Sequence, residues 1–156
     1  MKKIKGFTLI ELLVVISILG VLTALLLPNL VGSRQRARDA RRKHDLVEIK
    51  NALRLYYNDE QTYPEDSVFT FGSSWGEYMS SVPNDPLDGV NYHYCVSDDG
   101  NSFILAAELE NLGDPGIDES ITQCNPSTYH SLLSCSLSDC QDDDSEFVEC
   151  YYVCGD

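Results

Sequence analysis

The chain has 156 residues, which leaves room for one domain with a modest core besides an N-terminal helical stem. Its net charge of -14 is unevenly distributed, because all 11 Lys and Arg lie at or before Arg54 while 21 of the 25 Asp and Glu follow it. Phosphate contacts need cations, so the part after Arg54 is excluded as a nucleic-acid-binding surface. Its charge suits divalent cations or a basic partner instead.

The N-terminal segment contains an apolar run, residues 7–27, that carries one charge, Glu11. As a helix this run would be about 30 Å long, which matches the hydrocarbon thickness of a bilayer. A carboxylate inside such a run costs about 2.5 to 3.5 kcal/mol on insertion scales unless it is paired, so a functional partner is expected. Cleavage before Phe7 would create an α-amine one helical turn away, able to neutralise this carboxylate or that of a neighbouring chain.

The segment Gly6-Phe7-Thr8-Leu9-Ile10-Glu11-Leu12 follows a leader with three lysines and resembles the processing site of type IV pilins and type II secretion pseudopilins. The resemblance implies that a prepilin peptidase cuts between Gly6 and Phe7 and methylates the new amine. It also implies that an inner-membrane assembly platform extrudes the subunit from the membrane into a periplasmic or extracellular filament of identical or related subunits. Phe7 and Glu11 would then act in assembly.

Two plainer interpretations of the N-terminal segment are a secretory signal peptide and a simple membrane anchor. A secretory signal peptide would have an apolar core of about 7 to 15 residues and an A-x-A-like site, neither of which is present. A simple single-span anchor explains the length of the run but leaves Glu11 without a role. The pilin-like interpretation accounts for both features.

Six cations between Arg34 and Lys43 follow the apolar run, with Asp39 as the one acid among them. We expect this stretch to be solvated, or to lie near lipid head groups or acidic partners. Since only three cations precede the run, the positive-inside rule alone favours a cytoplasmic head. The resemblance and the cysteines favour the opposite orientation, with the leader in the cytoplasm and the head outside, and we adopt it.

The predicted fold is α+β, a pilin fold in which one long N-terminal helix packs on a small antiparallel sheet, followed by a disulfide-bearing C-terminal region. The domain boundaries are a leader over 1–6, a helix over 7–58 and a globular head over 59–156. The helix divides into a transmembrane and assembly half, 7–28, and an amphipathic half, 29–58. In the second half one face carries the core, formed by Leu46, Ile49, Leu53 and Tyr56.

The head contains a clear hairpin pattern. Apolar and polar residues alternate over 90–96 and again over 103–109, on either side of a turn at Asp98-Asp99-Gly100-Asn101. The segment EFVECYYV predicts a last strand with Cys150 and Cys154 on one face. Residues 53–64 and the D-P-x-x-G-x-x-Y-x-Y pattern of 85–94 resemble the major, G-type pseudopilin, although Leu87 replaces the aromatic residue of many members.

All the cysteines lie in the head. An even number in an exported domain predicts three disulfides, with a pairing that the sequence leaves open. A zinc site is the alternative, but the C-x4-C and C-x3-C spacings lack the C-x-x-C pattern usual for structural zinc. The candidates are Cys95, Cys124, Cys135, Cys140, Cys150 and Cys154.

One metal site is predicted, in the acidic stretch NLGDPGIDES, which we interpret as a loop. Asp114, Asp118 and Glu119, with loop carbonyls, offer the hard oxygen ligands that Ca2+ prefers. The resemblance adds that major pseudopilins bind calcium after the hairpin. The alternative is a solvated acidic loop that binds no ion.

Catalytic motifs are absent from the sequence: there is no phosphate-binding glycine loop, no G-x-S-x-G and no H-E-x-x-H, and the three histidines are isolated. We therefore expect a structural filament subunit and not an enzyme. The alternative is a minor pilin for adhesion or DNA uptake, although the head without cations argues against direct DNA binding. A membrane-anchored enzyme would need a convergent site that the sequence does not show.

Overall fold

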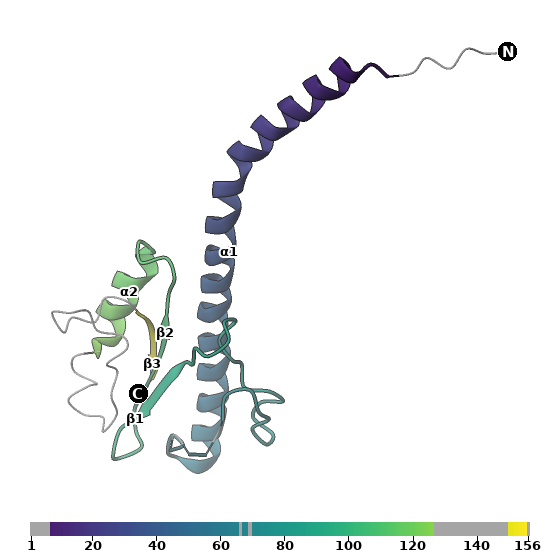
Figure 1. Cartoon of the computed structure of the whole chain (residues 1–156). Helices are drawn as coiled ribbons and strands as arrows, with labels where there is room; N and C mark the ends of the chain where they lie inside the picture. Colours follow the sequence, from purple (N-terminus) through teal and green to yellow (C-terminus); the bar gives the residue numbers. More distant parts are fainter. Residues whose placement is uncertain (1–6, 66, 69, 127–149, 156) are drawn as a thin grey trace. The chain divides into compact units, whose positions relative to one another are not determined.

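The computed structural model describes residues 7–65, 67–68, 70–126 and 150–155, and within the first helix it leaves out the side chains of residues 25–31. The elements follow the order α1 (Leu9–Glu60), β1 (His93–Val96), β2 (Phe103–Glu108), α2 (Pro115–Cys124) and β3 (Cys150–Gly155), as Figure 1 shows. Two compact units divide the chain, Met1–Arg36 and Ala37–Asp156, and α1 contributes to both.

In the first unit α1 begins at Leu9, two residues after the predicted cleavage position, and its apolar side chains are exposed around the whole helix. Among the described residues no helix is both long and apolar enough to cross a membrane. The expected membrane segment also includes residues 25–28, whose side chains lie outside the described part.

The second unit is built on a three-stranded antiparallel sheet in the order β1-β2-β3, which confirms the predicted hairpin. The predicted last strand is confirmed from Cys150 on, and its first part, 146–149, lies outside the described residues. Side chains alternate between the two faces of the sheet, as the period of two requires. On one face Phe103, Leu105 and Val153 pack against Leu46, Ile49 and Leu53 of α1. The amphipathic half of α1 therefore carries the core, as its periodicity predicts.

The other face of the sheet is covered by α2 (Figure 1). The sequence prediction of a loop over NLGDPGIDES is wrong in its second half, because α2 begins at Pro115. Asp114 caps the helix, Pro115 fits the first helical position, and Ile117, Ser120 and Cys124 are buried at helical spacing. The Gly, Pro and acidic residues of this stretch are typical of a loop, and they led to the wrong prediction.

Disulfide bonds are present, as the cysteine count predicts. Cys124 at the end of α2 is bonded to Cys154 on β3, with their Cα atoms 5.6 Å apart. Cys95 and Cys150 are also disulfide-bonded, and none of the described cysteines is free. Cys135 and Cys140 lie outside the described residues.

Candidate functional site

The N-terminal end of α1 is organised by a reciprocal pair of residues, Thr8 and Glu11. The Thr8 backbone N–H and hydroxyl both donate to Glu11 Oε2, at 2.9 and 2.5 Å, and the Glu11 backbone N–H lies 3.3 Å from Thr8 Oγ1. This is the capping-box pattern, in which the two side chains satisfy backbone N–H groups that the first turn leaves unpaired. The carboxylate is thereby held one turn from Phe7.

Beyond this pair, α1 presents an apolar surface with no partner among the described residues. The exposed fraction ranges from 84% for Phe7 to 47% for Val15, and it is still 52% at Leu22. A helix that is apolar on all sides is normally buried in lipid or among other helices. The described part of this surface therefore has the character of a segment that packs against other molecules.

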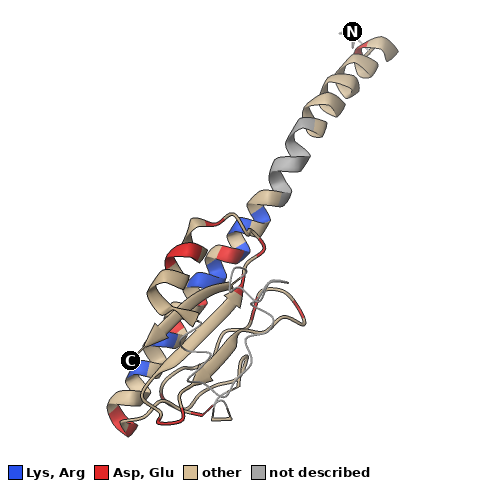
Figure 2. Ribbon diagram, turned by 90° about the vertical axis from the view of Figure 1, so that its left-hand side faces the viewer, with Lys and Arg blue, Asp and Glu red and all other residues tan. Residues whose placement is uncertain are grey.

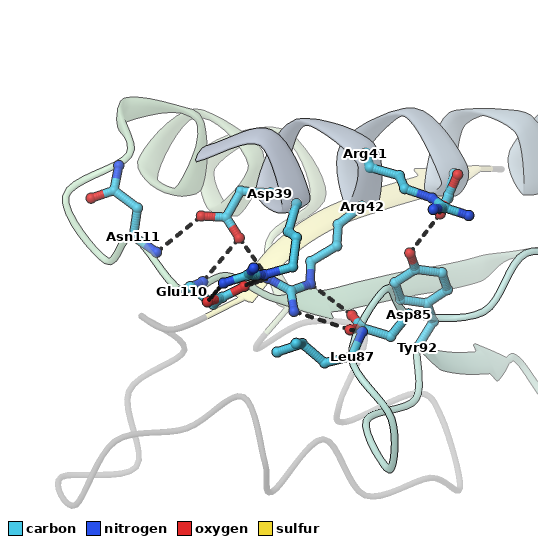
Figure 3. A network of polar contacts seen from close by, with 10 residues as sticks. Asp39, Arg41, Arg42, Asp85, Leu87, Tyr92, Glu110 and Asn111 are labelled. Carbon is cyan, nitrogen blue, oxygen red and sulfur yellow. Dashed lines mark hydrogen bonds and ion pairs between the residues drawn. The ribbon is translucent and has the colours of Figure 1, made fainter. Parts of the chain in front are cut away.

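A second polar site lies in the second unit, around the buried guanidinium of Arg42 (Figure 3). Its Nε and Nη2 donate to both carboxylate oxygens of Asp85, at 2.7 and 3.0 Å. Its Nη1 donates to Asp39 at 2.7 Å and to Glu110 at 3.0 Å. Although burial alone would lower the pKa of Arg42, its hydrogen bonds to Asp85 and Asp39 raise it, so the guanidinium stays charged.

Arg38 and Asp39 complete this network. Arg38 forms a two-pronged ion pair with Glu110, with both distances at 2.6 Å. The hydrogen bond from Arg38, followed by that from Arg42, lowers the pKa of Glu110 to about 2, against an opposing effect of burial. Asp39 accepts the backbone N–H groups of Glu110 and Asn111, each at 3.0 Å. The network thus joins α1 to the chain segment that follows β2.

This arrangement corrects the interpretation of the cation-rich stretch only for Arg38 and Arg42, whose acidic partners belong to the same chain. Three other cations of the stretch are exposed, as expected: Arg34, Arg36 and Arg41. Arg38 and Arg42 bind acids of the same chain that lie 43 to 72 residues away in sequence. One local signal was available, since Asp39 and Arg42 are spaced for contact on a helix. Next to the network, the Tyr92 hydroxyl donates to Asp45 at 2.8 Å, and burial, with this bond, raises the pKa of Tyr92.

The structure places the three candidate calcium ligands at the start of α2. Asp114 is its cap and forms an ion pair with Lys43, whereas Asp118 and Glu119 lie within the helix. The described acidic and histidine side chains that approach one another closely enough to share an ion are different ones, His44, Asp45 and Glu48, whose ligand atoms lie within 4.8 Å. Calcium at Asp114 stays a prediction that the geometry does not favour.

The comparisons with known proteins agree with the N-terminal site. Residues 1–27 match the family model described as the prokaryotic N-terminal methylation motif. Together with the relatives described next, this match and the α+β fold indicate a structural subunit of a filament. No solved structure matches the chain.

Curated relatives narrow the assignment. The type II secretion system core protein G of Klebsiella pneumoniae is 45% identical over 133 residues, which cover 77% of this chain and 91% of the relative. The core protein G of Vibrio cholerae is 32% identical over 129 residues, 73% of this chain and 88% of the relative. The type IV wide pilus major component PilA4 of Thermus thermophilus is 43% identical over 96 residues, 62% of this chain and 73% of the relative. The chain belongs to the family of type II secretion core protein G and related type IV pilins.

Proposed function

We propose that the chain is a subunit of a type II secretion filament, matured by cleavage between Gly6 and Phe7 and assembled through residues 7–28, which include the first part of α1. The observation that carries the proposal is a methylation motif followed at once by a helix whose apolar side chains are exposed on all sides. The core protein G relatives support the secretion assignment, because their matches cover 73% and 77% of this chain.

The location and partners follow from the same features. The leader remains in the cytoplasm, the apolar half of α1 lies in the inner membrane before assembly, and the head is exported. Disulfides in the head support export, since such bonds persist in oxidising compartments. The partners are a prepilin peptidase that also methylates Phe7, an inner-membrane assembly platform, and other pilin-like subunits.

Assembly would use the geometry of the capping box. Thr8 holds the Glu11 carboxylate at the end of the helix where cleavage leaves the Phe7 amine. When apolar helices pack together, the surroundings lose water and an unpaired charge becomes costly. The Phe7 ammonium of one copy therefore docks beside the Glu11 carboxylate of the next copy, which neutralises both charges.

The test separates the charge of Glu11 from its capping role. Glu11→Gln retains a side-chain acceptor compatible with a capping box but removes the charge. We expect normal leader cleavage and methylation by terminal-peptide mass spectrometry, with the yield of sheared filaments reduced about tenfold or more, since one unpaired charge costs several kcal/mol. Ser17→Ala is the control, because Ser17 is exposed on the same helix and is uncharged. Its hydroxyl donates to the Leu13 backbone carbonyl of the same helix.

Two results would contradict the proposal. Wild-type amounts of filament from Glu11→Gln would remove the charge-pairing mechanism. Filaments whose subunits still carry Met1 to Gly6 would remove the maturation step.

A type IV pilus subunit is the second candidate function, favoured by the identity to the wide pilus component. The two functions differ in what a deletion abolishes. Loss of protein secretion with normal surface pili supports the secretion filament, whereas loss of surface pili with normal secretion supports the pilus.

A further inference from the structure

Three elements of the second unit converge on the side-chain ammonium of Lys43. Lys43 belongs to α1, and its Nζ lies 2.6 Å from Asp114 Oδ1 at the start of α2. The same Nζ lies 5.2 Å from the ring centroid of Tyr151 on β3. The two charged side chains are about three-quarters buried, with 26% and 23% exposed. A charge-assisted hydrogen bond and a cation–π contact thus meet at one ammonium group.

Asp114 connects this ammonium to the first turn of α2. Its Oδ1 accepts the Gly116 backbone N–H at 2.8 Å as well as the Lys43 ammonium. A cation near a helix N-terminus is disfavoured by the helix dipole, so the carboxylate between them is what makes the position favourable. The position of the Lys43 ammonium and the cap of α2 therefore both depend on the Asp114 carboxylate.

Gly116 leaves the space that the ammonium occupies. A Cβ atom at this position would lie 2.8 Å from Lys43 Nζ and 3.0 Å from Asp114 Oδ1. Any larger residue would require the lysine to move. The small residue at position 116 therefore leaves the room that this ion pair needs.

The residues predicted to bind calcium do not fit that ion. Ca2+ takes about six to eight oxygen ligands, several of them from loop carbonyls. Asp114 is already committed to an ammonium and a backbone N–H. Asp118 and Glu119 lie in α2, where the backbone carbonyls accept hydrogen bonds within the helix. The Asp118 carbonyl, for example, accepts a hydrogen bond from Thr122 Oγ1.

We propose that the Lys43 ammonium takes the place of a divalent ion in this head, holding the start of α2 against α1 and β3, so that the fold does not depend on calcium. The cation is supplied by α1, which carries the Lys and Arg of the described residues, whereas Asp and Glu occur both on α1 and over the rest of the second unit (Figure 2). The other end of α2 is fixed covalently through Cys124 and Cys154. The inference is independent of the assembly mechanism, since its measurement is folding and not filament yield.

The first experiment is a double-mutant cycle on the full chain in detergent micelles. Trp75, the single tryptophan, is buried in the core of the second unit and reports melting by fluorescence. Lys43→Met keeps the apolar stem of the side chain, and Asp114→Asn keeps a good cap while removing the charge. We expect each change to lower the melting temperature by about 2 to 6 °C, and the double variant to be no worse than Asp114→Asn.

Arg54→Met is the matched control, since it removes an exposed cation from the same helix. Its melting temperature should stay within about 1 °C of wild type. If Lys43→Met melts like Arg54→Met, or if the losses of Lys43→Met and Asp114→Asn simply add, the proposed role of Lys43 is wrong.

The second experiment tests calcium directly. The melting temperature of the wild-type chain is measured in chelator, in about 10 mM CaCl2 and in NaCl of equal ionic strength. This CaCl2 concentration exceeds the dissociation constants of extracellular calcium modules, which are about 0.1 to 1 mM. We expect CaCl2 to raise the melting temperature no more than NaCl does. A larger rise in CaCl2 that disappears in Asp114→Asn would overturn the proposal and restore the metal site.

Discussion

Replacing Arg42 by Met should destabilise the second unit strongly, because this residue is the centre of a buried ion network. Its side chain is 2% exposed, and it donates four hydrogen bonds to three carboxylates. Methionine replaces the aliphatic part of the arginine side chain as far as Nε but carries neither the charge nor the donors. The substitution therefore leaves Asp39 and Asp85 as buried carboxylates without their cation.

The magnitude follows from what each carboxylate retains. Removing one partner of a buried ion pair typically costs about 3 to 5 kcal/mol. Asp85 still accepts the Leu87 N–H at 2.8 Å, and Asp39 still accepts two backbone N–H groups at 3.0 Å. We therefore expect a loss near the lower end, about 3 kcal/mol, which is a large share of the typical 5 to 15 kcal/mol of folding stability.

The assay is denaturant unfolding of the full chain in micelles, followed by Trp75 fluorescence. Arg41→Met is the control, because Arg41 is one residue away, has a side chain 65% exposed, and lies 3.7 Å from its acid partner. It should cost less than about 1 kcal/mol. Arg42→Lys should fall between the two, since an ammonium keeps the charge but cannot form the paired bonds to Asp85. Equal stabilities of the Arg42→Met and Arg41→Met variants would refute the reasoning.

Two further predictions concern pH and redox state. Because the pKa of Glu110 falls from 4.5 to about 2 in the folded chain, its contribution to stability should be complete above about pH 4.5 and disappear as the pH falls toward 2. Melting temperatures measured from pH 7 to pH 2 should therefore drop less in Glu110→Gln than in wild type within that window, and parallel curves would contradict the assignment. Replacing Cys124 and Cys154 together by Ser should cost about 3 to 4 kcal/mol, as a bond closing 30 residues predicts, and an unchanged denaturant midpoint would argue against a stabilising role.

Much of the fold follows from local and periodic patterns. The face formed by Leu46, Ile49 and Leu53 repeats with the period of a helix, and the strands on either side of the 98–101 turn alternate with the period of a strand. The methylation motif is a continuous segment, so it could be recognised without any tertiary contact. These features need only neighbours in sequence to be defined.

The sequence also contained weaker signals that its composition masked. The start of α2 is encoded by Asp114 as cap, Pro115 at the first position and Ile117 at the beginning of a buried face. A stretch rich in Gly, Pro and acids is typical of a loop, and this general tendency concealed the specific start signal. In the folded chain α2 covers the second face of the sheet, and burial of its apolar side chains there favours the helix.

By itself the sequence determined the processing motif, the long helix with its apolar half and core-bearing face, the hairpin and the presence of disulfides. Only the tertiary structure decided which acids pair with Arg42 and Lys43, and that Cys124 bonds Cys154. The physical reason is that charges and thiols carry no periodicity that identifies a distant partner. Many acids could pair with each cation, and several cysteines could bond with each thiol. The packing of α1 and α2 on the sheet determines which pairs form.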